Sequence, residues 1–98
     1  MKTLVFFISP FALNQKTVIV DDENKDYYKE RQFSIAELSE EGLALLKNYD
    51  IKKVIFKGPI KYTKRFFNDF KEEAITKYGY SNIEFELKGE KGETIWNI

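Results

Sequence analysis

Residues 52–87 constrain the fold more than any other part of the sequence. They run from an apolar stretch, KKVIFK, through a Gly-Pro loop and an amphipathic stretch, KRFFNDFKEEAITKY, to the alternating stretch GYSNIEFEL. An apolar run without alternation is typical of a buried strand, and a 3.6-residue period is typical of a helix. We therefore predict a β-α-β unit, which consists of two parallel strands and one covering helix.

The residues before this unit predict three further strands. Residues 3–9 are almost entirely apolar, so we expect this strand, like residues 54–56, to be buried on both faces. Residues 17–20 are β-branched throughout and predict the second strand. Apolar and polar side chains alternate over residues 27–35, which predicts a third strand near an edge of the sheet.

Two helices are expected, and the start of the first has two candidate caps. Ser34 with Glu37 fits a capping box, whereas Ser39 would place two acids in the first turn. We prefer Ser39, because it leaves the alternation of the third strand intact. For the second helix we expect Thr63 as the cap, an end near residue 78, and Gly79 in the left-handed position beyond it.

The chain order is βββαβαβ, with a further short strand over residues 94–98, and the 98 residues form a single domain. Because the first and fourth strands are the most apolar, we place them in the middle, and right-handed crossovers then give the order 3-2-1-4-5. A mixed α/β sheet of this order with two covering helices is the layout of the ribonuclease H-like fold. A small α+β sandwich with a differently placed helix is the alternative.

The loop between the fourth strand and the second helix adds a resemblance. The sequence GPIKYTKR, residues 58–65, resembles a Gly-Pro-Gly-Ser-Phe-Thr-Gly-Leu-Arg loop in an actin-like family, the non-catalytic partner subunit of the bacterial tRNA threonylcarbamoyladenosine machinery. The resemblance implies a ribonuclease H-like half-domain and a role as a partner subunit. The positions that match the family loop are Gly58, Pro59, Tyr62, Thr63 and Arg65. Two positions depart from it, because Ile60 and Lys64 replace glycines of the family loop.

Composition excludes several chemistries. The chain contains neither Cys nor His, which removes thiolate and Ser-His nucleophiles and most zinc sites, and we predict no metal and no cofactor. Sixteen basic and sixteen acidic residues cancel, so we expect neither nucleic acid nor a membrane as partner. The apolar N-terminus is short and is interrupted by Pro10, unlike a signal peptide, and we expect a cytoplasmic protein.

The start of the second helix carries the one local charge anomaly. Several cations surround it and no acid follows until Asp69, although the helix dipole makes cations unfavourable there. A bound anion would reverse the sign of this interaction. One hypothesis is therefore an anion or nucleotide site made by Lys57, Gly58, Lys61, Tyr62, Thr63 and Lys64; the alternative is that these lysines simply extend into water.

No catalytic constellation emerges from the sequence, and we predict no catalytic residue. A ribonuclease H-like nuclease needs a carboxylate on the first strand, which has none, and Asp21 and Asp22 lie in a turn at the opposite end of the sheet. The hairpin after the first strand also lacks the Gly and Asp that actin-like ATPases use. An enzyme would need carboxylates such as Glu37 or Glu40 at the sheet edge.

We therefore expect a non-enzymatic interaction or accessory module. A homodimer or a protein partner fits the two exposed edge strands, and a compact chain of this kind is typical of phage and mobile-element accessory proteins. Aromatic residues dominate the energetics of many interfaces. The aromatic candidates for partner contact are Phe11, Tyr27, Tyr28, Tyr62, Tyr80 and Trp96.

Overall fold

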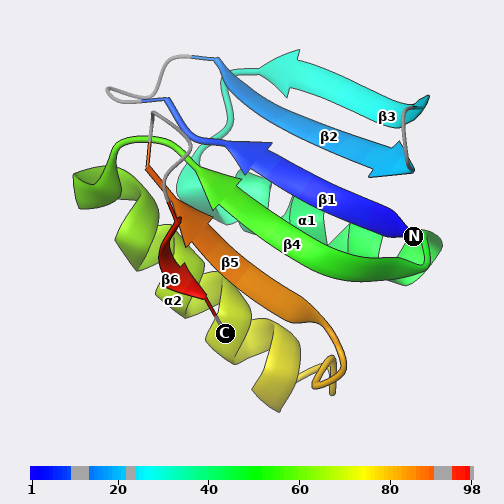
Figure 1. Ribbon diagram of the computed structural model, residues 1–98. Helices are drawn as coiled ribbons and strands as arrows, with labels where there is room; N and C mark the ends of the chain where they lie inside the picture. The colour runs from blue at the N-terminus through cyan, green and yellow to red at the C-terminus, as the bar shows by residue number, and fades with distance from the viewer. Residues whose placement is uncertain (10–13, 22–23, 90–93, 98) are drawn as a thin grey trace.

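The computed structural model describes residues 1–9, 14–21, 24–89 and 94–97, and for residues 94–97 the backbone only. Within these residues the chain forms one six-stranded sheet and two helices that lie side by side on the same face of it (Figure 1). The elements are β1 (Lys2–Phe7), β2 (Gln15–Asp21), β3 (Asn24–Arg31), α1 (Ile35–Asn48), β4 (Ile51–Lys57), α2 (Ile60–Thr76), β5 (Glu84–Lys88) and β6 (Thr94–Asn97).

The predicted sheet order is confirmed. The strands lie in the order β3-β2-β1-β4-β5-β6, so the expected 3-2-1-4-5 arrangement is extended by β6 at the β5 edge. Strand β4 is parallel to β1 and to β5, whereas β1–β2, β2–β3 and β5–β6 are antiparallel. This is the mixed α/β layout with two helices that the ribonuclease H-like expectation describes. The expected last strand, residues 94–98, is confirmed as β6 (Thr94–Asn97), and residue 98 lies outside the described residues.

The prediction that β1 and β4 are buried on both faces is wrong. Leu4 and Phe6 are completely buried under the helices, but Val5 is partly exposed and the side chain of Phe7 is 36% exposed. Strand β4 repeats the pattern, since Val54 is buried and Ile55 is not. Successive side chains of a strand point to opposite faces, and both helices cover the same face. The second apolar row of each strand therefore lies on a face that neither helix covers.

The covered face is held together by phenylalanine side chains. The ring centroid of Phe6 in β1 lies 5.2 Å from that of Phe56 in β4, and 5.1 and 5.2 Å from those of Phe66 and Phe70 in α2. Phe56 also meets Phe67 edge to face, with centroids 5.1 Å apart. Edge-to-face pairs at this distance add about 0.5–1.5 kcal/mol each beyond the burial of area. The cluster fixes α2 against the two central strands.

Helix α1 begins earlier than we expected. Ser34 is its N-cap: the Ser34 hydroxyl accepts from the Glu37 N–H, and the Glu37 carboxylate accepts from the Ser34 N–H. The preference for Ser39 is therefore wrong, and the third strand ends at Arg31 rather than at residue 35. The capping box satisfies two backbone groups that a helix start otherwise leaves unpaired, which favours Ser34. Its hydrogen bonds also lower the pKa of Glu37.

Helix α2 ends at Thr76, and Gly79 follows in the predicted left-handed conformation, with φ of 72°. The Gly79 N–H donates to the Ile75 carbonyl, and the Tyr80 N–H donates to the Ala74 carbonyl. These bonds satisfy carbonyl groups of the last turn. The backbone then reverses toward β5, as the β-α-β prediction requires.

Gly42 marks the closest approach of α1 to the phenylalanine cluster. A Cβ atom at this position would lie 2.4 Å from Cζ of Phe6 and 2.6 Å from Cε2 of Phe70. Glycine inside a helix costs about 1 kcal/mol relative to alanine. The short distance between the helix and the rings explains why the chain carries glycine here despite that cost.

We predict that Gly42→Ala lowers the free energy of unfolding by about 1–2 kcal/mol, because overpacking of roughly 1–3 kcal/mol outweighs the gain in helix propensity. Urea denaturation measures the change. The control is Ala44→Gly at an exposed position of α1, which should cost about 1 kcal/mol from propensity alone. A Gly42→Ala variant that is more stable than the parent would contradict the close packing.

Tyr27 connects β3 to α1 on the covered side of the sheet. Its hydroxyl donates to a Glu41 carboxylate oxygen, and its ring lies 6.1 Å from that of Tyr49. Burial, followed by the hydrogen bond to Glu41, raises the pKa of Tyr27 to about 12. The neutral phenol is therefore the form that the fold stabilises.

A raised pKa means that the folded protein holds this proton more tightly than the unfolded chain, so Tyr27 stabilises the fold below pH 10 and its contribution is lost as the pH rises toward 12. Ultraviolet absorbance during an alkaline titration should show a tyrosine step near pH 12, in addition to that of Tyr28, whose pKa is also raised by its hydrogen bond to Glu30, and Tyr27→Phe should remove the step near pH 12. Tyr78→Phe, at an exposed position, is the control. A late step that persists in Tyr27→Phe would assign it to another residue.

Candidate functional site

The carboxyl ends of the parallel strands β1 and β4 lie together. The Ile8 N–H donates to the Lys57 carbonyl at 2.7 Å. The buried side chain of Gln15 bonds to the backbone of Ser9 in both directions: Oε1 accepts from the Ser9 N–H at 2.6 Å, and Nε2 donates to the Ser9 carbonyl at 3.4 Å. Gln15 therefore positions the end of β1 and is not available to a ligand.

An open hollow of about 530 Å³ lies beside this edge. Within it, Glu30 accepts from Nδ2 of Asn14 at 3.5 Å, and Nζ of Lys16 lies 4.0 Å from the same carboxylate. A hydrogen bond from the Tyr28 hydroxyl lowers the pKa of Glu30. The carboxylate is thus charged and already engaged. The hollow is lined by Phe7, Ile8, Ser9, Asn14, Lys16 and Glu30.

The start of α2 differs from the prediction. Pro59 occupies the N-cap position and Thr63 lies inside the helix, completely buried, so Thr63 is not the cap. The Thr63 N–H already donates to the Pro59 carbonyl. Gly58 has φ of 155°, and a Cβ there would lie 2.4 Å from the Ile8 carbonyl oxygen and 2.8 Å from Oγ1 of Thr63. Gly58 and Thr63 thus form a close contact between α2 and the end of β1.

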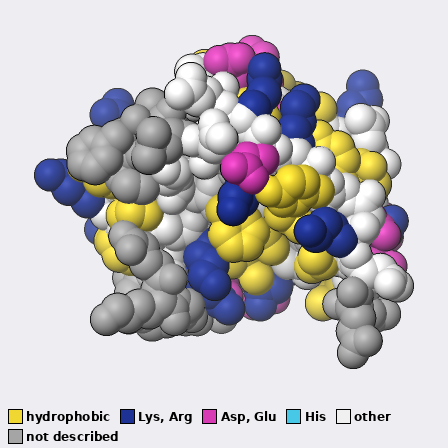
Figure 2. Space-filling view, turned by 90° about the horizontal axis from the view of Figure 1, so that it is seen from above, with side chains coloured by type: hydrophobic (Ala, Val, Ile, Leu, Met, Phe, Trp, Pro, Cys, Tyr) yellow, Lys and Arg dark blue, Asp and Glu magenta, His cyan; other side chains and the backbone are white. Residues whose placement is uncertain are grey.

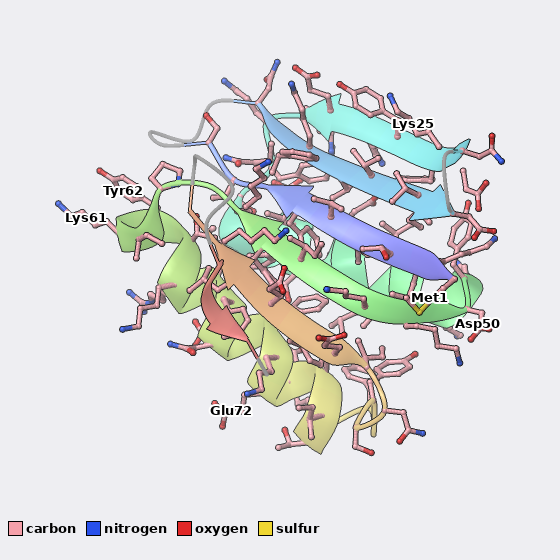
Figure 3. All side chains as sticks on the ribbon, in the orientation of Figure 1. Met1, Lys25, Asp50, Lys61, Tyr62 and Glu72 are labelled. Carbon is pink, nitrogen blue, oxygen red and sulfur yellow. The ribbon has the colours of Figure 1, made fainter. Side chains whose placement is uncertain are left out.

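The structure separates the cations of the proposed anion site. Lys57 lies on the face of the sheet opposite the helices, with Nζ 6.0 Å from the centre of the Phe7 ring. Lys61 and Lys64 are exposed on the first turns of α2, and Figure 3 shows Lys61 and Tyr62 extending away from the sheet. Of the six predicted residues, Gly58 and Thr63 pack together and Lys61, Tyr62 and Lys64 share the helix surface, while Lys57 belongs elsewhere.

The face without helices, which we call the open face, has an apolar centre. Its middle row runs across five strands in direct register, from Tyr28 through Val18, Val5 and Ile55 to Glu86. Phe7 lies in the next row. On this face Lys16 and Lys57 lie next to Phe7, and Glu30 lies next to Lys16. Figure 2 looks onto the neighbouring β3 edge, where hydrophobic side chains lie between basic and acidic ones. The open face thus combines apolar side chains with charged side chains of both signs.

Charged side chains border the apolar centre. Beside Ile55, the carboxylate of Glu86 lies between Nζ of Lys53, at 3.6 Å, and Nζ of Lys88, at 3.3 Å, with only 7% of its side chain exposed. Lys16 and Lys57 flank Phe7 in register. The open face therefore has an apolar centre with charged side chains at its borders.

Neither the exposure of Phe7 nor the open face was predicted from the sequence. Phe7 was assigned to a strand buried on both faces, yet one signal pointed the other way: Lys53, Ile55 and Lys57 occur at every second position of β4. Two lysines on the same side of a strand favour a face in contact with water. Among the aromatic candidates, Tyr28 and Tyr62 are exposed, whereas Tyr27 and Tyr80 pack partly against the core. Phe11 and the side chain of Trp96 lie outside the part of the chain that the structure describes.

The carboxylates considered for catalysis do not converge. Glu37 serves the α1 cap and lies 3.3 Å from Arg31, and Glu40 is exposed on α1. Asp21 pairs with the N-terminal amine at 2.9 Å, at the opposite end of the sheet from Gly58; Asp22 is outside the described residues. Among the residues described, no group of three or more acidic side chains could hold a metal ion.

Neither helix in the described part of the chain is long and apolar enough to cross a membrane.

No protein-family model and no curated protein sequence matches this chain. A crystal structure of Pelota from Archaeoglobus fulgidus is similar in fold, with a TM-score of 0.60 and 17% sequence identity. The similarity covers 90% of this chain but only 26% of the Pelota chain. At this identity the comparison supports the fold alone.

The double variant Lys61→Ala, Lys64→Ala distinguishes an anion site at the start of α2 from lysines that only extend into water. If these lysines only extend into water, the variant should be more stable than the parent by about 0.3–1 kcal/mol per residue, because two cations no longer oppose the helix dipole. Thermal unfolding with and without inorganic phosphate measures this, and Lys47→Ala on α1 is the control. A phosphate-dependent stabilisation that the double variant loses would instead establish an anion site.

Proposed function

We propose that this chain is a non-enzymatic interaction module that binds a protein partner through the open face of its sheet. The observation that carries the proposal is that both helices cover one face while the other keeps a continuous apolar row. In that row Val5 and Ile55 are partly exposed, whereas Val18 between Tyr28 and Val5 is buried, with 7% exposed. Burying such side chains contributes about 25 cal/mol per Å² of apolar area.

The arrangement of the open face also supports the proposal. Protein interfaces combine an apolar core, depleted in charge, with a polar rim. Here the valine and isoleucine side chains lie centrally, and lysines and glutamates of β3 and β5 lie outside them. Tyr28, 47% exposed, and Phe7 supply the aromatic side chains that typically anchor an interface.

Two earlier expectations belong to this proposal. The loop resemblance suggests a partner-subunit role, and the compact single domain suits an accessory protein of a phage or mobile element working in the cytoplasm. Both agree with a module whose main exposed feature is a binding face.

A photo-crosslinking amino acid at defined positions tests the proposal. With p-benzoylphenylalanine in place of Phe7 or Tyr28, irradiation of cells that produce the protein should join it to another polypeptide. The matched control is the same substitution at Tyr78, an exposed aromatic position beyond the end of α2. Equal adduct yields from position 78, or no polypeptide adduct from positions 7 and 28, would contradict binding through the open face.

A further inference from the structure

We infer that the partner of the open face is a second copy of this chain, packed face to face about a two-fold axis parallel to β1. The inference rests on the proposed function and specifies its partner. It is argued from the charge pattern of the open face, which is complementary to itself.

The open face consists of three rows of side chains in register. Beside the apolar middle row, the row at the carboxyl end of β1 begins with Glu30 in β3 and ends with Lys88 in β5. The row at the amino end begins with Lys25 and ends with Glu84 in the same two strands. The four ends of these rows, which we call the corners, therefore alternate in sign; β6 continues the sheet beyond β5, and its side chains lie outside the described part of the chain. The full rows are Glu30, Lys16, Phe7, Lys57 and Lys88, and Lys25, Val20, Thr3, Lys53 and Glu84.

A two-fold axis parallel to β1 places β3 of one copy over β5 of the other, β2 over β4, and β1 over β1. Each row of side chains then faces the same row of the second copy. Lys25 then faces Glu84 of the second copy, and Glu30 faces its Lys88. A two-fold interface repeats every contact, so each of these pairs occurs twice. All four corners of the interface are thus occupied by opposite charges.

The same axis places apolar side chains on apolar side chains at the centre of the face. Val5 faces Val5, Phe7 faces Phe7, and Val18 faces Ile55, while outside this centre Tyr28 faces Glu86 and Val20 faces Lys53. A two-fold axis across the strands would also match the corner charges, but it would place Phe7 on Thr3. Lys16 facing Lys57 is the one like-charged pair of the favoured arrangement. Two sheets stacked with nearly aligned strands form the ordinary geometry of a β-sandwich.

Of the two corner pairs, Lys25 and Glu84 are the better probe. Glu30 already lies near Lys16, and Lys88 lies 3.3 Å from Glu86. Lys25 has its Nζ 4.6 Å from the centre of the Tyr28 ring, on the open face, and both Lys25 and Glu84 are exposed. Reversing either charge changes the surface without removing core packing.

The size of the face sets the expected strength. Strands about 4.8 Å apart with a rise of about 3.3 Å per residue make it roughly 20 Å by 20 Å. This projected area of about 400 Å² is half of the roughly 800 Å² per partner that standard specific interfaces bury. The zero net charge of the chain adds no long-range repulsion between copies. We therefore expect a dimer that dissociates on dilution.

Sedimentation velocity of the purified chain from about 5 to about 500 μM tests the inference. We expect a shift from monomer to dimer, weakened about tenfold by Lys25→Glu or Glu84→Lys and restored in the double variant, because the pair is only inverted. Glu72→Lys, on α2 and directed away from the sheet (Figure 3), is the matched control and should leave dimerisation unchanged. Circular dichroism checks that each variant folds.

Val5→Asp, which places a charge in the apolar centre, should abolish the dimer. A chain that stays monomeric at the highest concentration, or a dimer that Glu72→Lys weakens as much as Glu84→Lys, overturns the inference. If the purified chain is monomeric while position 7 crosslinks to a different polypeptide in cells, the second copy is excluded and the proposed function stands. Crosslinks to nucleic acid alone would overturn both.

Discussion

Packing of phenylalanine rings between β1, β4 and α2 is the interaction on which the rest of the structure depends. Phe6 and Phe56 lie in neighbouring parallel strands, and both meet Phe66 and Phe70 of one helix. Bulky rings allow a chain of this length to form a core on one side of its sheet. Their size also fixes details nearby, because Gly42 is needed where α1 approaches the rings of Phe6 and Phe70.

One-sided packing has a direct consequence for function. The rings bring both helices to the same face, so every second side chain of the central strands lies on the other face. Polar side chains at those positions would make an inert surface. Here Val5, Phe7 and Ile55 are apolar, and lysines and glutamates surround them. The fold therefore presents an apolar patch as a fixed platform whose positions are set by the register of the sheet.

Much of the fold followed from periodicity and chain order. The β-α-β unit over residues 52–87 fixed β4, α2 and β5, and crossover handedness then gave the order of the sheet. The expected Ser39 cap and the expected end of the third strand at residue 35 were wrong for one reason. Two local sequence patterns, a strand alternation and a helix capping box, overlap in this part of the chain. The alternation at Phe33 and Ile35 continued past the end of β3, while Ser34 and Glu37 formed the capping box that starts α1.

The candidate site was harder to predict. An unbroken apolar run such as residues 4–8 is compatible with burial on both faces, and also with one covered face and one binding face. Only the placement of both helices on one side distinguishes these cases. For the cations near Gly58, closeness in sequence did not predict closeness in space. Lys57 and Lys61 are close in sequence, but the end of β4 directs Lys57 to the open face, whereas Lys61 lies on the helix side.

Methyl resonances of the protein, recorded by nuclear magnetic resonance at increasing protein concentration, test the role of the open face most directly. Val5, Val18 and Ile55 report on that face, and Ile75 of α2 reports on the helix layer. Dimerisation through the open face predicts concentration-dependent shifts of the first three methyl groups, with Ile75 unchanged. Shifts confined to Ile75, or no shift at any position, would contradict it.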